Sequence, residues 1–189
     1  MRSKNNLFTL TISSILIAIG ILVPMIMPKV IIGPASFTLG SHVALFLGIF
    51  ISPAVALAVV LGTSLGFLLS SFPLVIVLRA LSQVVFVMVG AFWIQKNPRL
   101  LISQSGRLMF ALVTGLIHAA CEFLVVALFF FSGNLSQATV SQGFFISVLA
   151  LVGGGTFLHS LVDFVLALGI WQAVYKQIHC HLPNSAILK

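Results

Sequence analysis

Residues 7–27 read LFTLTISSILIAIGILVPMIM, an apolar run that contains no charged side chain. A transmembrane α-helix needs about 20 consecutive apolar residues to cross a hydrocarbon core about 30 Å thick. The basic start with Arg2 and Lys4 is typical of a signal peptide, but the apolar run is too long for one and lacks an A-x-A-like cleavage site. We therefore expect a retained first transmembrane helix at about residues 7–27.

The composition of the whole chain also indicates a membrane protein. Of its 189 residues, 60% are hydrophobic and only 6% are charged, whereas soluble proteins have roughly 45–50% apolar and about 25% charged residues. Further apolar runs are separated by Pro, Gly, Ser and charged residues, which predicts more helices. The expected helices span about residues 7–27, 37–51, 53–70, 73–94, 107–131 and 143–175. They use nearly all of the chain, so we expect residues 1–189 to form a single all-α membrane domain, a bundle of six transmembrane helices.

Basic residues gather in three segments: before the first expected helix, between the fourth and fifth, and after the sixth. They are Arg2, Lys4, Lys96, Arg99, Arg107, Lys176 and Lys189. Lys and Arg are retained on the cytoplasmic side during insertion, and the three segments share one side only if the number of helices is even. We therefore expect six helices with both termini cytoplasmic. Anionic lipid is the expected partner of these charges, which account for most of the net charge of +7, so nucleic acid is not an expected partner.

Small residues recur at four-residue steps in the first three expected helices, a spacing that lets helix backbones approach closely in a bilayer. They are Ser14 and Ala18, then Gly40, Ala44 and Gly48, then Ala54, Ala58, Gly62 and Gly66. The spacing is compatible with packing inside the bundle, which we favour for the second and third helices, and with docking of another membrane subunit. In the sixth expected helix, the run from Gly153 to Gly155 predicts a kink or a close crossing.

Ionisable side chains inside the expected helices are the most informative residues, because each is costly in hydrocarbon unless it is paired or faces a hydrated cavity. They are His42, Arg79, His118, Glu122, His159 and Asp163. The four-residue spacing places His118 beside Glu122, and His159 beside Asp163. One interpretation is structural: Arg79 pairs with Glu122, and His159 pairs with Asp163, to tie helices together.

The other interpretation is a polar cavity, open to the outside, that binds a small anionic solute. Arg79 would receive the anionic group, because a guanidinium forms forked hydrogen bonds to a carboxylate, and Lys29 in the first outer loop would assist it. The binding residues expected on this interpretation are Lys29, His42, Arg79, Gln83, Glu122 and Asn134, with Phe37, Phe72 and Phe131 available to cover an aromatic body.

With these features the chain resembles the S components of energy-coupling factor transporters, the substrate-binding membrane subunits of bacterial vitamin uptake systems. The resemblance covers nearly the whole chain and rests on six helices in about 190 residues, the small pair on the first helix, a Pro-containing first outer loop and a short second helix. The segment 28–39, PKVIIGPASFTL, followed by Ser41 and His42, and the segment 78–82, LRALS, look most like niacin-specific members.

The resemblance implies a subunit of the bacterial cell membrane that binds a vitamin in the outer half of the bundle and carries out no chemistry. A separate transmembrane coupling subunit, called the T subunit, and two ATPases would supply the energy. The resemblance also places the six binding residues at the site, and Ser14 and Ala18 on the coupling face, although the family usually has alanine at the position of Ser14. We expect no catalytic residue, cofactor or metal. The chain has no Walker-type phosphate loop, so ATP-driven uptake would require those partners.

Other functions stay open at this stage. The solute of an S component could be pantothenate or another vitamin. A stand-alone secondary transporter could relay protons through His118 and Glu122 and through His159 and Asp163, although residues 1–94 and 95–189 show no internal repeat. An intramembrane metal enzyme is disfavoured, because no H-E-x-x-H pair occurs and the histidines and carboxylates are expected at different depths.

Overall fold

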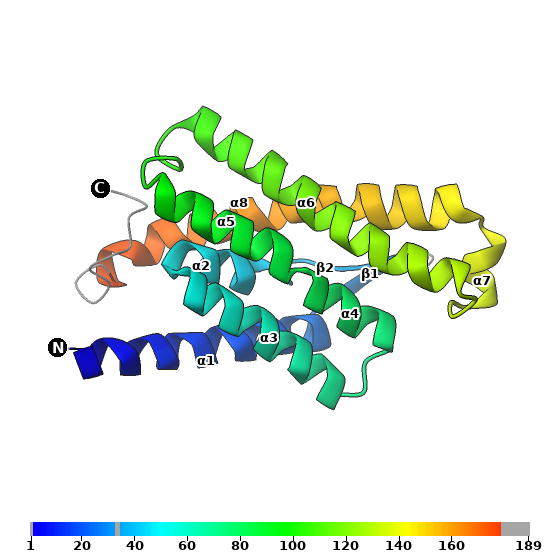
Figure 1. Ribbon diagram of the computed structural model, residues 1–189, viewed down its shortest axis with the longest axis horizontal. Helices are drawn as coiled ribbons and strands as arrows, with labels where there is room; N and C mark the ends of the chain where they lie inside the picture. The colour runs from blue at the N-terminus through cyan, green and yellow to red at the C-terminus, as the bar shows by residue number, and fades with distance from the viewer. Residues whose placement is uncertain (1, 33–34, 179–189) are drawn as a thin grey trace.

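The computed structural model describes residues 2–32 and 35–178, and these residues are almost entirely helical (Figure 1). Lys189 and the Gly33–Pro34 pair, both used in the sequence analysis, lie outside these ranges. The helices are α1 (Arg2–Ile26), α2 (Val43–Ile51), α3 (Pro53–Leu69), α4 (Leu74–Ser82), α5 (Val84–Lys96), α6 (Gln104–Phe131), α7 (Gln137–Ser141), the π-helix η1 (Phe145–Gly154) and α8 (Gly155–Ile178). One antiparallel hairpin joins β1 (Lys29–Ile32) to β2 (Ala35–Thr38).

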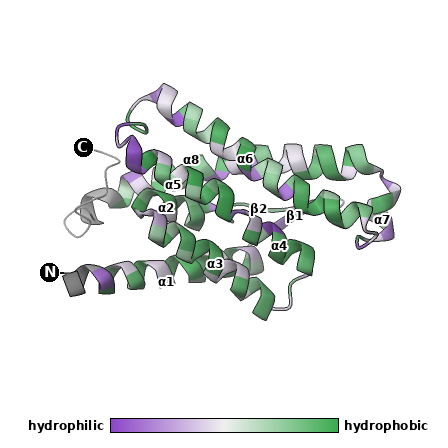
Figure 2. Cartoon of the chain, viewed as in Figure 1, coloured by the Kyte–Doolittle hydropathy of each residue, from purple (hydrophilic) through white to green (hydrophobic). Residues whose placement is uncertain are grey.

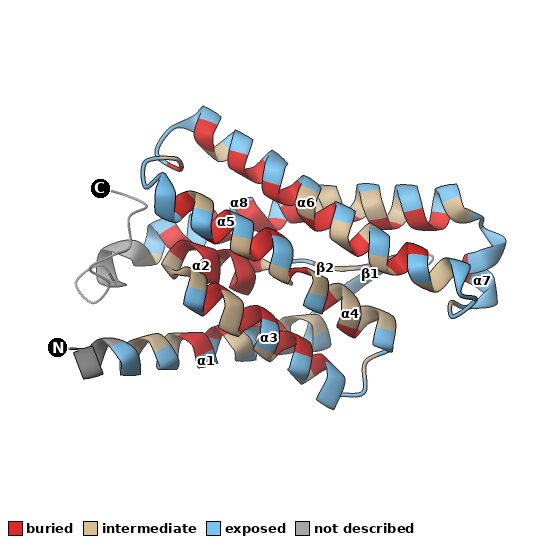
Figure 3. Cartoon of the chain, in the orientation of Figure 1, coloured by how far each residue is buried: buried red, intermediate tan, exposed pale blue. Residues whose placement is uncertain are grey.

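Several helices have the length and composition of membrane spans. Within the described residues, four stretches are long and apolar enough to cross a bilayer: Asn6–Ile26, Leu74–Lys96, Gln104–Phe131 and Phe145–Val174. α3 is apolar but shorter. Many residues of these helices are both hydrophobic and exposed, as the colouring in Figures 2 and 3 shows, and Leu116 and Leu128 on α6 are 65% and 71% exposed. A water-soluble protein would bury such side chains, so the prediction of an all-α membrane protein is confirmed.

The second helix differs most from the sequence prediction. It was expected at about residues 37–51, but α2 begins only at Val43. Residues 35–38 instead pair with β1, with Phe37 opposite Val30 and Thr38 opposite Lys29. The chain then turns at Gly40, whose φ of +81° is a conformation that glycine adopts without steric cost. The short helix is therefore preceded by a hairpin whose backbone groups are hydrogen bonded within the protein.

The fourth and sixth expected helices are each divided. α4 and α5 are separated at Gln83, where one continuous helix was expected. The last span begins as the π-helix η1 and becomes α-helical at Gly155. Gly155 lies against the ring of Phe37, and a Cβ at this position would overlap that ring. Of the run Gly153–Gly155, for which a kink or a close crossing was predicted, Gly155 alone makes a close approach, and its partner is the hairpin.

The junction of α2 and α3 follows its sequence signal. Ser52 precedes Pro53, and its Oγ accepts a hydrogen bond from the backbone N–H of Val55 at 3.2 Å. A capping serine followed by proline at the first helical position is a typical helix start. This start lets α3 begin without an intervening loop, as predicted.

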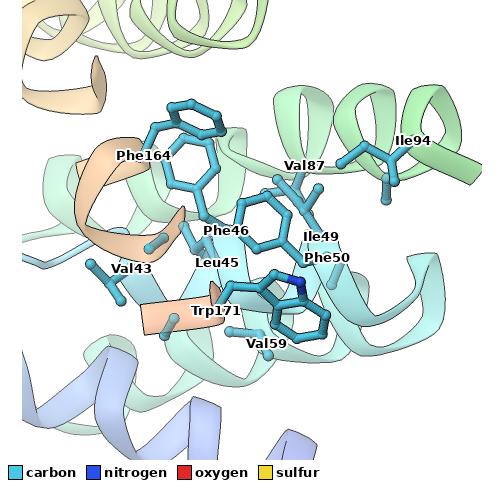
Figure 4. Close-up of a cluster of buried hydrophobic side chains, with 14 of the residues drawn as sticks. Val43, Leu45, Phe46, Ile49, Phe50, Val59, Val87, Ile94, Phe164 and Trp171 are labelled. Carbon is cyan, nitrogen blue, oxygen red and sulfur yellow. The ribbon is translucent and has the colours of Figure 1, made fainter. Parts of the chain in front are cut away.

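α2 lies at the centre of the bundle and packs against α1, α3, α5 and α8. The cluster in Figure 4 surrounds it: the rings of Phe46 and Phe164 meet edge to face with centroids 5.5 Å apart, and those of Phe50 and Trp171 at 5.8 Å. These four side chains are almost fully buried. Aromatic contacts of this geometry are favourable, so this core fixes α2 against α8.

α1 packs on α3 through small residues. A Cβ at Gly62 or Gly66 would overlap the side chains of Ile17 and Ile21, respectively, so these glycines allow close approach of the two helices. Packing inside the bundle is thus the correct interpretation for these two positions. Figure 1 also shows the beginning of α1 and the end of α8 at one end of the molecule, with α7 at the other.

Candidate functional site

A cavity of about 110 Å³ lies among the hairpin and the helices α1, α2, α3, α4, α6 and α8. Its polar wall includes Lys29, Ser41, His42, Arg79, Gln83, Glu122, Thr156 and His159, and its apolar wall includes Pro24, Phe37, Leu45, Phe67, Phe72 and Ile76. Pockets that enclose drug-sized ligands are larger, about 300–1,000 Å³. The cavity therefore suits a small solute with both polar and aromatic parts.

Glu122 on α6 is the centre of the first polar group. Its Oε2 accepts hydrogen bonds from Arg79 Nη2 at 2.6 Å, Arg79 Nε at 3.1 Å and Thr156 Oγ1 at 3.0 Å. Its Oε1 accepts one from Gln83 Nε2 at 2.9 Å and lies 3.2 Å from His118 Nε2. Both carboxylate oxygens are thus occupied by protein donors. Glu122 ties α4, α6 and α8 together, as the structural interpretation predicted for its pair with Arg79.

Arg79 nevertheless has one guanidinium edge that donates to no hydrogen-bond partner among the described residues. A guanidinium has five N–H donors, and Glu122 takes only the edge formed by Nε and Nη2. Among the described residues no hydrogen bond uses Nη1, and the side chain lines the cavity with 14% of its surface exposed. Lys29 lies near the same cavity, with its Nζ 5.7 Å from the centre of the Phe72 ring. The cavity therefore presents one guanidinium edge and one ammonium group beside an aromatic ring.

Asp163 on α8 is the centre of the second polar group. Its Oδ1 accepts the backbone N–H of Gly40 at 2.8 Å, and its Oδ2 accepts that of His42 at 2.9 Å. The same Oδ2 lies 3.1 Å from His42 Nδ1 and 3.2 Å from His159 Nε2. The predicted pairing of His159 with Asp163 is confirmed. Asp163 also anchors the turn that precedes α2, a contact between residues far apart in sequence.

Ring contacts connect the two polar groups. The rings of His42 and His118 meet edge to face with centroids 4.6 Å apart, and Phe86 stacks on His118 at 4.4 Å. His118 is fully buried and also lies 3.3 Å from Ser160 Oγ. The polar side chains thus form one network through the middle of the bundle, with His42 at the junction.

The structure brings together most of the residues expected at the site. Five of the six expected binding residues line the cavity: Lys29, His42, Arg79, Gln83 and Glu122. Asn134 does not line it. Its exposed side chain instead donates to Ser132 Oγ at 2.9 Å. α6 continues to Phe131, more than two turns beyond Glu122, which carries Asn134 away from the cavity.

Of the three phenylalanines expected to cover an aromatic ligand, two line the cavity and one does not. Phe37 and Phe72 line the cavity, whereas Phe131 at the end of α6 is 74% exposed and packs against Phe144. Sequence reasoning missed Thr156, which shares a helix face with His159 and Asp163 at steps of three and four residues. The spacing of these three polar residues could have identified Thr156 from the sequence.

The fold and the cavity define a class: a multi-pass α-helical membrane protein with a small polar and aromatic cavity inside the bundle. Among proteins of established function, the chain is similar to the niacin transporter NiaX of Lactococcus lactis subsp. cremoris (strain MG1363), with 40% identity over 184 residues, which are 97% of this chain and 82% of the relative. The chain belongs to the family of this niacin transporter. No family model and no solved structure matches it.

This membership confirms the resemblance to niacin-specific S components that was drawn from the sequence. It also confirms a role in vitamin uptake and a location in the membrane of bacteria as a multi-pass protein.

Proposed function

We propose that the chain binds niacin, in its anionic form nicotinate, inside the cavity between the hairpin and α4. The observation that carries the proposal is the free edge of Arg79 on the wall of an aromatic-lined cavity, in a relative of a niacin transporter. Nicotinate is a planar aromatic ring with one carboxylate. A guanidinium edge matches the two oxygens of a carboxylate, and aromatic side chains match the faces of a ring.

We propose a role for each group from its contacts. Nη1 and Nη2 of Arg79 receive the ligand carboxylate, with Lys29 as a second cation, and Phe37 and Phe72 cover the ring. Glu122 acts by positioning Arg79 and makes no contact with the ligand, because its oxygens already accept from protein donors. His42 and Gln83 contribute directional hydrogen bonds at the polar wall.

We further propose that the chain is the S component of an ATP-driven energy-coupling factor transporter, with a T subunit and two ATPases as partners. Ser14 and Ala18 support this proposal, because both are exposed on α1, on a face that no other part of the described chain covers. Small exposed residues on a transmembrane helix suit close docking of another helix. The sequence contains no phosphate-binding loop of its own.

The topology proposed with this function has six membrane crossings, both termini cytoplasmic and the cavity in the outer half. The second crossing requires explanation, because α2 has nine residues and spans only about 14 Å of a core about 30 Å thick. The hairpin that precedes α2 provides the rest of the second crossing. Non-helical backbone is tolerated at this depth where it is buried in protein or lines a cavity, and residues of β1 and β2 line the cavity.

The test is binding of labelled nicotinate, nicotinamide and pantothenate to the detergent-purified chain, without partners. Tight binding of nicotinate, with much weaker binding of the other two, is expected. Preference for pantothenate would refute the choice of solute. Co-expression with T and ATPase subunits should yield a stable complex whose nicotinate uptake requires ATP.

A proton-coupled transporter is the second candidate, because the contact of His42 with His118 joins the two histidine–carboxylate pairs into one network. Nicotinate uptake by vesicles that contain the chain alone, driven by a pH gradient, would favour this candidate and exclude obligatory ATPases.

A further inference from the structure

Three side chains that could bind a metal ion converge close to the turn that precedes α2. His42 and His159 line the cavity, and Asp163 is fully buried beside them. His42 Nδ1 and His159 Nε2 lie 3.1 and 3.2 Å from Asp163 Oδ2, and ligand atoms of the three residues all fall within 4.8 Å of one another. Ser41 Oγ lies 3.0 Å from His159 Nε2 and 3.3 Å from His42 Nδ1. Ligands about 2.0–2.1 Å from a tetrahedral metal ion are about 3.3 Å from one another. The distances from Asp163 Oδ2 to the two histidine nitrogens are close to that value.

The charge of Asp163 distinguishes this group from an ordinary hydrogen-bonded cluster. Its side chain has 0% exposed surface, and no lysine or arginine pairs with it among the residues that the structure describes. A buried carboxylate within a membrane needs a positive charge nearby. A cation bound between the three side chains would meet that need.

The other histidine–carboxylate group lacks this property. His42, His118 and Glu122 also bring their ligand atoms within 4.8 Å. However, the carboxylate of Glu122 already has a cation, because Arg79 Nη2 lies 2.6 Å from Oε2. That guanidinium neutralises the carboxylate and repels a second cation. His42 belongs to both groups but can bind only one ion. The charges favour an ion at the group that contains Asp163.

We propose that His42, His159 and Asp163 form a binding site for a divalent transition-metal ion of the zinc or cobalt type. Imidazole and carboxylate donors are those that such ions prefer. The backbone N–H groups of Gly40 and His42 hold the carboxylate in orientation, as outer partners do in metal sites. His42 and His159 are 12% and 11% exposed and line the cavity, so an ion reaches them from there. Ser41 Oγ or a solute oxygen completes a fourth position.

The inference goes beyond vitamin binding and contradicts the sequence expectation of no metal. That expectation assumed that the histidines and carboxylates lie at different depths. The turn at Gly40 lowers the start of α2 toward Asp163 on α8, which brings His42 and His159 to the same carboxylate oxygen. The separation along the chain is large, so no sequence motif marks the group.

The test is a titration of the detergent-purified, chelator-treated chain with Co²⁺, read by visible absorption, with no vitamin present. His179, Cys180 and His181 in the C-terminal segment also offer donors, so they are replaced by Ser in the parent protein, which carries no histidine tag. The parent is expected to bind one Co²⁺ per chain with a tetrahedral spectrum.

Two variants each remove one proposed metal ligand, and a third variant is the matched control. His159→Gln and Asp163→Asn should each weaken Co²⁺ binding at least about tenfold, because changes even to outer partners of metal sites cost about 10–100-fold. His118→Gln, which removes a ligand of the rival group only, should bind Co²⁺ like the parent. No Co²⁺ binding by the parent, equal binding by the ligand variants, or loss of binding in His118→Gln would overturn the proposal.

A second measurement needs no variant and so survives a failure of the variants to fold. X-ray absorption of the Zn²⁺-loaded parent should show only nitrogen and oxygen ligands at about 2.0–2.2 Å, two of them imidazoles. A sulfur ligand at about 2.3 Å would place the ion at Cys121 instead and contradict the proposal. Because neither assay contains vitamin, a failed nicotinate binding experiment leaves this proposal unaffected, and the reverse also holds.

Discussion

Arg79 has two roles in these proposals, as partner of Glu122 and as anchor of the ligand carboxylate, and a pair of substitutions separates them. Arg79→Met removes the cation but leaves a buried carboxylate without a permanent counter-charge. Removing one partner of a buried ion pair costs about 3–5 kcal/mol of stability. This single variant therefore loses both stability and nicotinate binding, and does not by itself distinguish the roles.

The double variant Arg79→Met with Glu122→Gln is the informative protein. It contains no unpaired charge, and replacement of a buried ion pair by neutral groups of similar volume is often close to neutral for stability. Its melting temperature in detergent should therefore recover most of the loss seen in Arg79→Met. Its affinity for nicotinate should stay low, because removing one partner of a buried charge pair costs about 2–5 kcal/mol, which is roughly 30-fold or more.

Two further comparisons use the same binding assay with labelled nicotinate. Arg79→Lys should recover only part of the affinity, because an ammonium group cannot form the two parallel hydrogen bonds of a guanidinium edge. The parent protein should bind the neutral amide, nicotinamide, far less tightly than nicotinate, and the double variant should have lost most of this preference. If the double variant binds nicotinate as tightly as the parent protein, Arg79 is only the structural partner of Glu122. The reason for proposing an anionic vitamin would then be removed.

The remaining predictions concern topology and packing. Cysteines placed at Lys4, Lys96 and Lys176 should resist an impermeant thiol reagent added outside intact cells, because the proposed topology puts these positions on the cytoplasmic side, and labelling would refute that topology. Ala18→Trp should prevent co-purification of the T subunit while nicotinate binding is unchanged, and an intact complex would place the coupling face elsewhere. Gly62→Leu should destabilise the chain by about 1–3 kcal/mol through overpacking of α1 against α3, seen as a lower melting temperature in detergent. An equally bulky replacement at an exposed alanine of α3 is its control, and an equal effect there would contradict the packing argument.

Local patterns explain which predictions the structure confirmed. Apolar runs of membrane length depend only on neighbouring residues, and α1 and α6 lie close to the expected ranges. A spacing of four residues on one helix fixes two side chains on the same face. For that reason the pairs of His118 with Glu122 and His159 with Asp163 were predictable from sequence.

The geometry does not support the expectation that Asn134 lies at the binding site, and there is a physical reason why the sequence could not place it. A loop residue has no helical periodicity to direct it, so its distance from the cavity depends on how far α6 continues. α6 ends at Phe131. Beyond it, the Asn134 side chain donates to Ser132, and the Asn134 backbone N–H donates to the carbonyl of Phe129 at the end of α6. No property of the residue itself indicated this.

The sequence by itself determined that the chain is an all-α membrane protein of the vitamin transporter type, where its apolar helices lie, and which ionisable residues had to be paired or hydrated. Those properties follow from composition and from contacts within one helix. The tertiary structure alone decided that residues 35–38 pair as a hairpin, that Arg79 gives one edge to Glu122 and keeps the other for the cavity, and that His42 meets Asp163. The two side-chain contacts depend on residues far apart in the chain, which become neighbours only when the helices pack. The hairpin is local in sequence, but its Phe37 ring packs against Gly155 of α8, a contact that no local pattern indicates.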